Sequence, residues 1–403
     1  MSQEPPARSP AAAERARDLN REAMAAMSRR DLAGAKARLE EALRLSDQDA
    51  SLWINMAACE RALGEPEAAL TAVEGALALD ARNFMALLMK ASLLERLGRL
   101  RQAAGAYGVA LTQAPPEDRL DAATRQALRH ARDVNGRHRA ELQAFIHAEM
   151  ADTLSQTASA ETRRLQAFAD MLVGVRRNYR QQPVDFFYPG MPAIEFYDRE
   201  HFPWLPELEA RTEVIREELQ SALALDAGRF TPYIKYSENV PLDQWAELNH
   251  SSRWSAFHLI EFGAPQEAAC ARCPKTMAAI SALPQPQIPG RSPAAMFSQL
   301  QPRTRIPPHT GVANVRLVMH LPLIVPPGCG FRVGNESREW TVGEGWVFDD
   351  TIEHEAWNES DQPRVILICD VWSPFLSEIE RDGIARVMSA MDRFSETVPA
   401  GGV

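Results

Sequence analysis

A spacing of 34 residues recurs along the first third of the chain and constrains its fold more than any other feature of the sequence. Two sets of alanines, one set of leucines and one set of large apolar residues return at this interval. The sets are Ala35, Ala69 and Ala103; Ala42, Ala76 and Ala110; Leu43, Leu77 and Leu111; and Leu39, Val73 and Tyr107. Because alanine lets the two helices of a hairpin approach closely, this period predicts a stack of two-helix units.

The region that carries this period resembles the tetratricopeptide family of helical repeats. Other residues typical of that repeat are Gly64 and Gly98 in the interhelical turn, Trp53 in a first helix, and Pro115 at the close. We predict about three repeats over 16–117 and a capping helix over 118–150. Together they would form a helical domain at 15–150, after a disordered N-terminus at 1–14. Stacks of this kind usually bind peptides or proteins on their concave face, so we expect a protein partner there.

Composition excludes several classes of protein. The chain has 403 residues and a formal net charge of −10 at pH 7, which argues against general nucleic-acid binding. No apolar run approaches the roughly 20 residues of a membrane span, and the N-terminus lacks the apolar segment of a signal peptide. We therefore expect a cytoplasmic protein with no membrane partner. Cys270 and Cys273 form a C-x-x-C with no second pair nearby, so we expect reduced thiols there and not a zinc site.

The pattern of the sequence changes after Gln181. Residues 151–180 still look helical and would connect two domains, and 206–224 have the pattern of one amphipathic helix. Short β-rich runs broken by Pro, Gly and Asn then follow, at Trp254–Glu261, Ala295–Gln301, Asn314–Leu323, Gly330–Val333, Trp346–Phe348 and Val365–Val371. Several short strands with turn signals between them predict a sandwich or jelly roll. We place this domain at 181–396, with a helix over most of 374–396.

Two histidines within the β-rich region indicate a metal site. His309 opens the string His-Thr-Gly-Val-Ala-Asn-Val-Arg-Leu, and His354 lies in Glu-His-Glu-Ala-Trp-Asn; Arg364 follows ten residues later. Imidazoles on separate strands followed by an arginine suggest non-haem iron and a clamp for 2-oxoglutarate. Such sites usually have a carboxylate two residues after the first histidine. Here that position is Gly311, which cannot supply one.

The surrounding strings resemble the aspartyl/asparaginyl β-hydroxylase family, which is known for a two-histidine iron site without the carboxylate. The resemblance covers roughly 180–380. It is carried by Phe187-Tyr188-Pro189-Gly190, Trp254-Ser255-Ala256-Phe257, Cys273-Pro274-Lys275-Thr276, His309-Thr310-Gly311, Asn314, Arg316-Leu317, Met319-His320-Leu321, Pro327-Gly328-Cys329, Phe348-Asp349-Asp350, Glu353-His354-Glu355, Trp357 and Asp370-Val371-Trp372. Some members of that family also carry tetratricopeptide-like repeats ahead of the oxygenase domain.

The resemblance implies a role for each candidate residue. His309 and His354 would bind Fe(II), Arg364 and Ser298 the distal carboxylate of 2-oxoglutarate, His320 its proximal carboxylate, and Arg316 the substrate. Asp349 and Asp350 would hydrogen-bond the ligand histidines and the strand turn, and Gly311 would leave room for a water. The chain departs from the family at Val318, where a second arginine is common, and at Ser373, where histidine is common.

We therefore predict an all-α tetratricopeptide-like domain followed by a double-stranded β-helix (jelly-roll, cupin-like) domain with flanking helices. The expected activity is that of a 2-oxoglutarate-dependent dioxygenase that uses Fe(II) and O₂. By resemblance its target is the β-carbon of an aspartyl or asparaginyl residue in a peptide or protein. Two alternatives stay open: a hydroxylase of a small molecule or lipid acyl chain, which the change at Val318 allows, and a non-catalytic tetratricopeptide scaffold.

Overall fold

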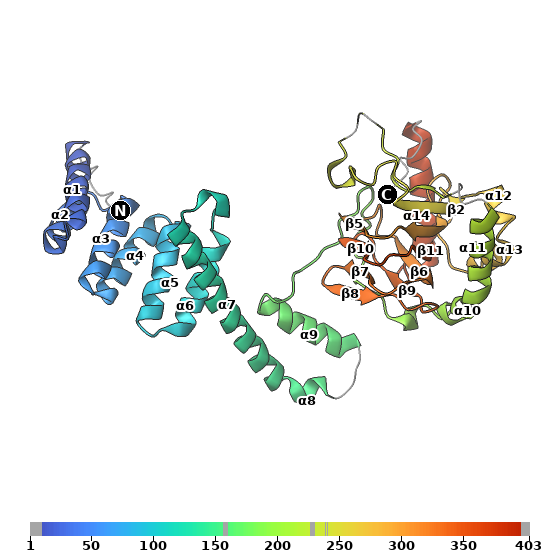
Figure 1. Cartoon of the computed structure of the whole chain (residues 1–403), viewed down its shortest axis with the longest axis horizontal. Helices are drawn as coiled ribbons and strands as arrows, with labels where there is room; N and C mark the ends of the chain where they lie inside the picture. The colour runs from blue at the N-terminus through green and yellow to red at the C-terminus, as the bar shows by residue number, and fades with distance from the viewer. Residues whose placement is uncertain (1–9, 156–159, 226–229, 238, 240, 396–403) are drawn as a thin grey trace. The chain divides into compact units, whose positions relative to one another are not determined.

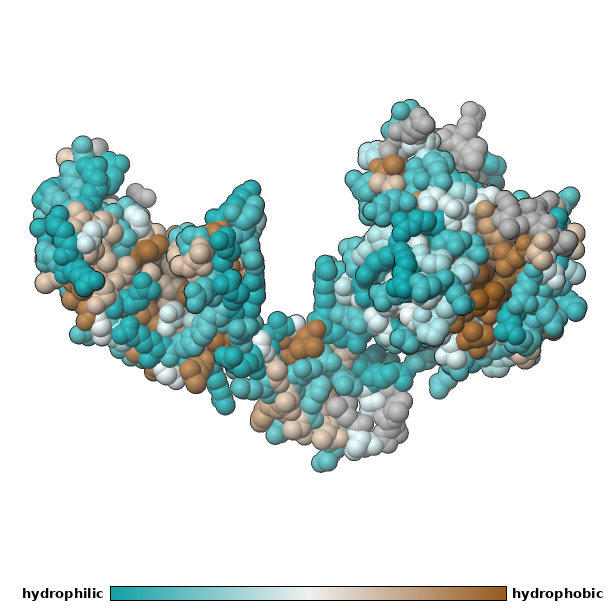
Figure 2. Space-filling model, in the orientation of Figure 1, coloured by the Kyte–Doolittle hydropathy of each residue, from teal (hydrophilic) through white to brown (hydrophobic). Residues whose placement is uncertain are grey.

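The chain divides into two compact units, Met1–Val175 and Arg176–Val403. Figure 1 shows the structure, a computed structural model that describes residues 10–155, 160–225, 230–237, 239 and 241–395. Within these ranges no helix combines the length and the apolar character that crossing a lipid bilayer requires. The visible surface of both units is mainly hydrophilic, and hydrophobic surface lies in separate patches (Figure 2).

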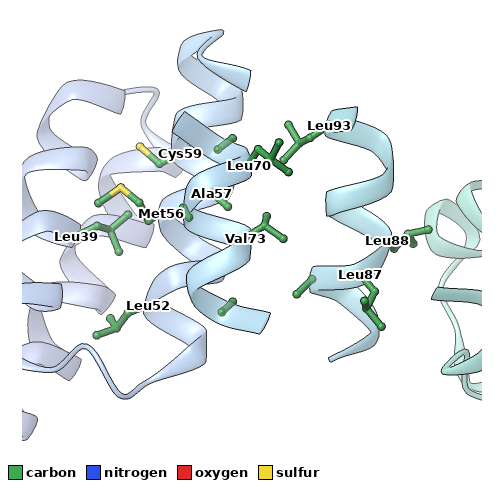
Figure 3. Close-up of a cluster of buried hydrophobic side chains, with 14 of the residues drawn as sticks. Leu39, Leu52, Met56, Ala57, Cys59, Leu70, Val73, Leu87, Leu88 and Leu93 are labelled. Carbon is green, nitrogen blue, oxygen red and sulfur yellow. The ribbon is translucent and has the colours of Figure 1, made fainter. Parts of the chain in front are cut away.

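Three antiparallel helix pairs make up most of the first unit. They are α1 (Pro10–Ser28) with α2 (Leu32–Leu45), α3 (Ala50–Leu63) with α4 (Pro66–Leu79), and α5 (Phe84–Arg96) with α6 (Leu100–Thr112). The alanines of the two repeating sets are fully buried, as close helix packing requires. Figure 3 shows Leu39, Met56 and Val73 among the buried side chains between these helices. The predicted stack of helical repeats is confirmed.

Local sequence explains how the second pair turns and packs. Gly64 ends α3 in the left-handed conformation, with φ of 87°, which glycine adopts without a steric penalty. The indole N–H of Trp53 donates to the carbonyl of Asp47 at 2.8 Å, and its ring packs against Gly75. A Cβ at Gly75 would lie 2.7 Å from that ring, so glycine is required for this close helix approach.

A long helix, α7 (Ala122–Glu149), packs against α6 in the place of the predicted capping helix. Helices α8 (Ala151–Leu154) and α9 (Ala160–Leu172) follow, so the predicted helical connector over 151–180 is helical in its described part as far as Leu172, and residues 173–180 are not helical. Asp170 of α9 accepts hydrogen bonds from Gln143 and His147 of α7, which joins α9 to the first unit. The disorder predicted for 1–14 is wrong for 10–14, which begin α1; residues 1–9 lie outside the described residues.

The second unit contains two antiparallel sheets. The larger has the order β1-β2-β4-β11-β6-β9, with β3 paired to β2, and the smaller has the order β5-β10-β7-β8. The strands are β1 (Thr231–Pro232), β2 (Trp254–Glu261), β3 (Ala264–Pro265), β4 (Ala295–Leu300), β5 (Thr304–His309), β6 (Arg316–Ile324), β7 (Cys329–Val333), β8 (Glu336–Glu339), β9 (Trp346–Phe348), β10 (His354–Asn358) and β11 (Arg364–Trp372). We predicted a helical domain followed by an antiparallel β domain, and the structure confirms this order.

Alternation along β6 and β11 separates two hydrophobic layers. Leu317, Met319 and Leu321 belong to the core that the larger sheet shares with its covering helices. Val318 and Ile366 belong to a second core, to which the smaller sheet contributes. Alternate side chains of a strand point to opposite faces. The residues that alternate with Leu317, Met319 and Leu321 therefore face the smaller sheet. The cavity described below lies on that face.

The covering helices include α10 (Leu205–Glu209), α11 (Thr212–Leu225), α12 (Glu267–Cys270) and α13 (Pro274–Ile280), and α14 (Glu378–Ser395) follows the last strand. The single helix predicted over 206–224 is wrong, because the chain breaks between α10 and α11. Glu209 sits at this break and accepts hydrogen bonds from Arg199 and from the backbone N–H of Gly345. The break allows leucines of α10 and apolar residues of α11 to enter one core.

Candidate functional site

A cavity of about 430 Å³ opens between the two sheets of the second unit. Side chains from both sheets line it. Its lining includes all six residues to which the sequence analysis assigned a role in binding iron, 2-oxoglutarate or substrate, namely Ser298, His309, Arg316, His320, His354 and Arg364. Residues 66 positions apart in the chain thereby share one site, which the antiparallel pairing of β4, β11 and β6 makes possible.

His309 and His354, the dyad, face each other across two paired strands. They are register partners at the end of β5 and the start of β10, and their ring centroids lie 4.0 Å apart. Nδ1 of His309 lies 2.8 Å from the carbonyl of Pro307, and Nδ1 of His354 lies 3.0 Å from that of Ile352. A carbonyl only accepts, so each Nδ1 carries the proton and each Nε2 keeps a free lone pair, as a metal ligand must.

Electrostatics keep both imidazoles neutral. Burial lowers the pKa of His309 to about 3, with a smaller contribution from neighbouring His354. Burial likewise lowers the pKa of His354 to about 4. At neutral pH the dyad therefore presents two uncharged nitrogen donors, the form that binds a transition metal. Backbone carbonyls, and not the carboxylate of Asp350, accept the Nδ1 protons. Asp350 hydrogen-bonds His354 through its backbone.

Gly311 has no room for a side chain. A Cβ at this position would lie 1.9 Å from Oδ2 of Asp350, so the carboxylate of Asp350 fills the space. The N–H of Gly311 also donates to the carbonyl of Asp350 at 2.6 Å. Within the described residues no group of three or more His, Cys, Asp or Glu side chains is placed to hold a metal ion. The metal-binding potential of the cavity therefore rests on the dyad.

Arg364 is a buried cation without an anionic partner. Its side chain is 1% exposed, and no carboxylate in the described part of the chain lies within ion-pair distance of it. Its Nη1 makes one long bond of 3.5 Å to the carbonyl of Ser298, and its Nε has no partner. Burial lowers its pKa to about 10, so it stays charged at neutral pH. A buried unpaired charge is costly unless an anion joins it.

Neighbouring groups make the surroundings of Arg364 suitable for a carboxylate. The Oγ of Ser298 accepts a bond of 3.2 Å from the indole N–H of Trp254, which leaves its own proton free to donate. Burial lowers the pKa of His320 far below its usual value, and its Nδ1 has no partner. The guanidinium of Arg364 lies 4.8 Å above the ring of Trp340, whose buried N–H also lacks a partner.

Arg316 lines the cavity but is already paired. Its Nη1 lies 3.0 Å from Oδ2 of Asp350 and 3.3 Å from Oδ1 of Asp370. The other oxygen of Asp370 accepts bonds from the hydroxyl of Ser292 and the N–H of Ala294, so this carboxylate is fixed. We call Arg316, Asp350 and Asp370 the carboxylate-paired arginine. Both carboxylates raise the pKa of Arg316, although burial opposes them.

Sequence reasoning missed Trp254, Trp340 and Tyr233 as cavity residues, and missed the pairing of Asp370 with Arg316. Trp254 and Asp370 stand within strings that had been singled out, so a signal existed. Trp340 follows β8, a short polar strand with no hydrophobic pattern, and nothing in the sequence marked it. Asp349 accepts bonds from Thr351 within the turn, as expected, and burial raises its pKa to about 6.

Comparison with known proteins shows that the second unit is similar to a group of hydroxylases. The model of the family "Aspartyl/Asparaginyl beta-hydroxylase" matches residues 209–374. The ornithine lipid ester-linked acyl 2-hydroxylase of Rhizobium tropici is 36% identical over 191 residues, which are 47% of this chain and 63% of that protein. The mouse aspartyl/asparaginyl beta-hydroxylase is 33% identical over 186 residues, 46% of this chain and 25% of the relative. The chain thus spans less than two thirds of the length of either relative.

The helical unit is similar to solved repeat structures. The tetratricopeptide domain of Arabidopsis OM64 is 23% identical with a TM-score of 0.27, covering 30% of this chain and 98% of that one. The tetratricopeptide domain of Sgt2 from Aspergillus fumigatus is 19% identical with a TM-score of 0.28, covering 39% of this chain and 92% of that one.

Proposed function

We propose, on the premise that the β domain of this chain belongs to the aspartyl/asparaginyl beta-hydroxylase family, that the protein is an Fe(II)- and 2-oxoglutarate-dependent hydroxylase of an unactivated C–H bond. One observation carries the proposal. A pair of neutral imidazoles and a buried, unpaired guanidinium line the same cavity. The first is a binding site for a transition metal and the second for a carboxylate, and 2-oxoglutarate joins the two requirements in one molecule.

Each residue would have a distinct task. His309 and His354 would hold the iron through Nε2, because their Nδ1 protons are bound to backbone carbonyls. Arg364 would pair with the distal carboxylate, and the free hydroxyl proton of Ser298 would add a hydrogen bond to it. His320 would face the proximal carboxylate. Asp350, whose Oδ1 has no partner, would stand beside the position that lacks a third protein ligand.

The chemistry of the bound groups is the coupled oxidation in which substrate, O₂ and 2-oxoglutarate give hydroxylated substrate, succinate and CO₂. The protein's contribution is to orient the reactants and to exclude water from the site. Apolar side chains on both sheets, including Ile306, Ile366 and Phe348, line the cavity for that purpose.

The names of the family and of its relatives indicate two kinds of substrate. The family description names aspartyl and asparaginyl residues, whose β-carbon is bonded to a carboxyl or amide carbon. The name of the Rhizobium tropici relative gives the 2-position of an ester-linked acyl chain. In all of them the hydroxylated carbon is bonded directly to a carbonyl carbon. A peptidyl β-carbon is the substrate that we expected from the sequence, and the helical repeats would then offer a surface for a protein partner.

The experiment measures iron and 2-oxoglutarate binding under anaerobic conditions, followed by succinate release when O₂ is admitted. We expect His309→Ala and His354→Ala to lose iron binding. His201→Ala, at an exposed histidine of the same unit, serves as the matched control and should bind iron as the unchanged protein does. Iron binding that survives loss of the dyad, or the absence of binding in the unchanged protein, would leave the scaffold alternative as the better explanation.

A further inference from the structure

We infer that Gln181 is a positioning residue for the iron site and that the segment 176–190, which we call the strap, holds both turns beside the ligand histidines. The inference rests on the proposed function and adds to it residues that the sequence analysis did not single out. The strap begins where the helical unit ends, and it lies outside residues 209–374, which the family model matches. Its role is read from its hydrogen bonds.

Two short turns flank the dyad. Residues 310–314 directly follow His309, the last residue of β5, and residues 349–353 directly precede His354, the first residue of β10. Because each turn is continuous with a ligand histidine, a shift of either turn moves an imidazole. The relative position of the two turns therefore helps to set the spacing of the two metal-binding nitrogens.

The backbone of the strap is bonded to both turns. The N–H of Gln182 donates to the carbonyl of Thr351 at 2.7 Å, and the N–H of Val184 donates to the carbonyl of Gly311 at 2.9 Å. The strap continues along the first turn, where Phe186 forms a parallel bridge. One continuous segment thus fastens the turn after His309 and the turn before His354.

The side chain of Gln181 joins the same two turns. Its Nε2 donates to Oδ2 of Asp349 at 2.5 Å, and its Oε1 accepts from Nδ2 of Asn314 at 3.0 Å. Asp349 and Asn314 are both buried, so neither can replace the bond to Gln181 with one to bulk water. Hydrogen bonds to an ionised group are roughly twice as strong as those between neutral groups.

Hydrogen bonds lead from Asp349 to the ring of His354. Oδ1 of Asp349 accepts the N–H of Thr351 at 2.9 Å, and its backbone carbonyl accepts the N–H of Ile352 at 3.2 Å. The carbonyl of Ile352 in turn lies 3.0 Å from Nδ1 of His354 and accepts its proton. Gln181 therefore holds Asp349, Asp349 shapes the turn, and the turn sets the rotation of the imidazole.

A metal held by two protein ligands depends strongly on how those ligands are oriented. Within the described residues no third His, Cys, Asp or Glu side chain joins the dyad, so no other side chain of these types compensates when an imidazole turns away. Removing a residue that orients a ligand histidine typically weakens metal binding about 10–100-fold. Gln181 acts through Asp349, so we expect an effect near the lower end of this range.

The first measurement is the affinity of the full-length, metal-free protein for Fe(II) under anaerobic conditions, by calorimetry. Gln181→Met keeps the length of the side chain but removes both hydrogen bonds, and it should weaken Fe(II) binding about tenfold. Gln181→Glu keeps the acceptor for Asn314 but places a like charge beside Asp349, and it should also weaken binding. Gln182→Met is the matched control and should bind as the unchanged protein does, because the side chain of Gln182 is exposed and makes no hydrogen bond within the described residues.

A second measurement separates positioning from a general loss of stability. Co(II) serves as a probe, because its visible absorption reports the geometry of its ligands, and spectra are recorded at saturating metal. We expect a changed spectrum for Gln181→Met and an unchanged one for Gln182→Met. Equal Fe(II) affinity in these two variants, or weaker binding with an unchanged spectrum, overturns the inference. Absence of Fe(II) binding by the unchanged protein contradicts the proposed function itself and removes both, which distinguishes it from a failure of this inference alone.

Discussion

Replacement of Arg364 by methionine should stabilise the ligand-free protein while abolishing its affinity for 2-oxoglutarate. Burial lowers the pKa of Arg364 from its ordinary value to about 10. This drop corresponds to a penalty of about 3 kcal/mol for holding the guanidinium charged, since one pKa unit is about 1.4 kcal/mol. Because the folded-state pKa lies below the unfolded one, the penalty is present at neutral pH and disappears as the pH rises above 10.

The stack of Arg364 on Trp340 offsets part of that penalty. A desolvated cation–π contact contributes up to about 2 kcal/mol, and here the guanidinium lies 4.8 Å from the ring. The net gain from Arg364→Met is therefore about 1–3 kcal/mol. For a unit of this size each kcal/mol raises Tm by about 2–4 °C, so we expect a rise of roughly 2–12 °C.

Thermal unfolding in a buffer without carboxylates or phosphate measures this change, with and without 2-oxoglutarate. The unchanged protein should gain Tm from the ligand, and Arg364→Met should not. Arg332→Met is the matched control, because Arg332 bonds Glu355 and Glu353 and its loss should lower Tm. A fall in Tm for Arg364→Met like that of the control, or an undiminished ligand effect, would refute the reasoning.

Three further outcomes follow from the same geometry. Trp340→Phe keeps the ring under Arg364 but removes a buried N–H without a partner; calorimetry should show 2-oxoglutarate binding about 10–100-fold more weakly, as for a lost hydrogen bond to a charged group. Trp346→Phe, which removes a similar unpartnered N–H outside the cavity lining, should bind normally, and equal losses would show a packing effect instead. Gly311→Ala pushes a Cβ to 1.9 Å from Asp350, so chemical denaturation should show a loss of about 3 kcal/mol as a buried ion pair is disturbed; an unchanged midpoint would contradict it. Burial lowers the pKa of both dyad imidazoles, to about 3 and about 4; metal-free protein should therefore lose stability as the pH falls from 6.5 towards 4, and a flat Tm over that range would disprove the burial.

The helical repeats could be predicted because burial makes the same demand on each copy. Ala35, Ala69 and Ala103 meet equivalent neighbours, so the sequence shows their role without any structure. The strands that run through both cores were predicted for a similar reason. Strands β5, β8 and β10 were missed because they are short or interrupted by polar residues and proline; β5 ends and β10 begins at the dyad. Their pairing in one sheet decides their conformation, and that pairing is not local in sequence.

The candidate site also combines residues that the sequence reveals with contacts that only the structure shows. Its histidines and Arg364 stand in strings that a single sequence can reveal, and the structure brings them to one cavity. The pairing of Arg316 with Asp370 depends on the register of β6 and β11, where Trp372 lies opposite Arg316. Trp340 reaches Arg364 from the segment that follows β8 of the other sheet. Contacts of that kind arise from packing between distant segments, so no local pattern could have indicated them.

The space that Asp350 takes beside Gly311 has a consequence for the order in which this site can change. An aspartate cannot be introduced at 311 alone, because the volume that its side chain needs is occupied. Emptying position 350 first would leave Arg316 with Asp370 as its remaining close carboxylate. A three-ligand site is thus separated from the present one by at least two substitutions, and each single intermediate is unfavourable. A third ligand at this position would therefore require positions 311 and 350 to change together.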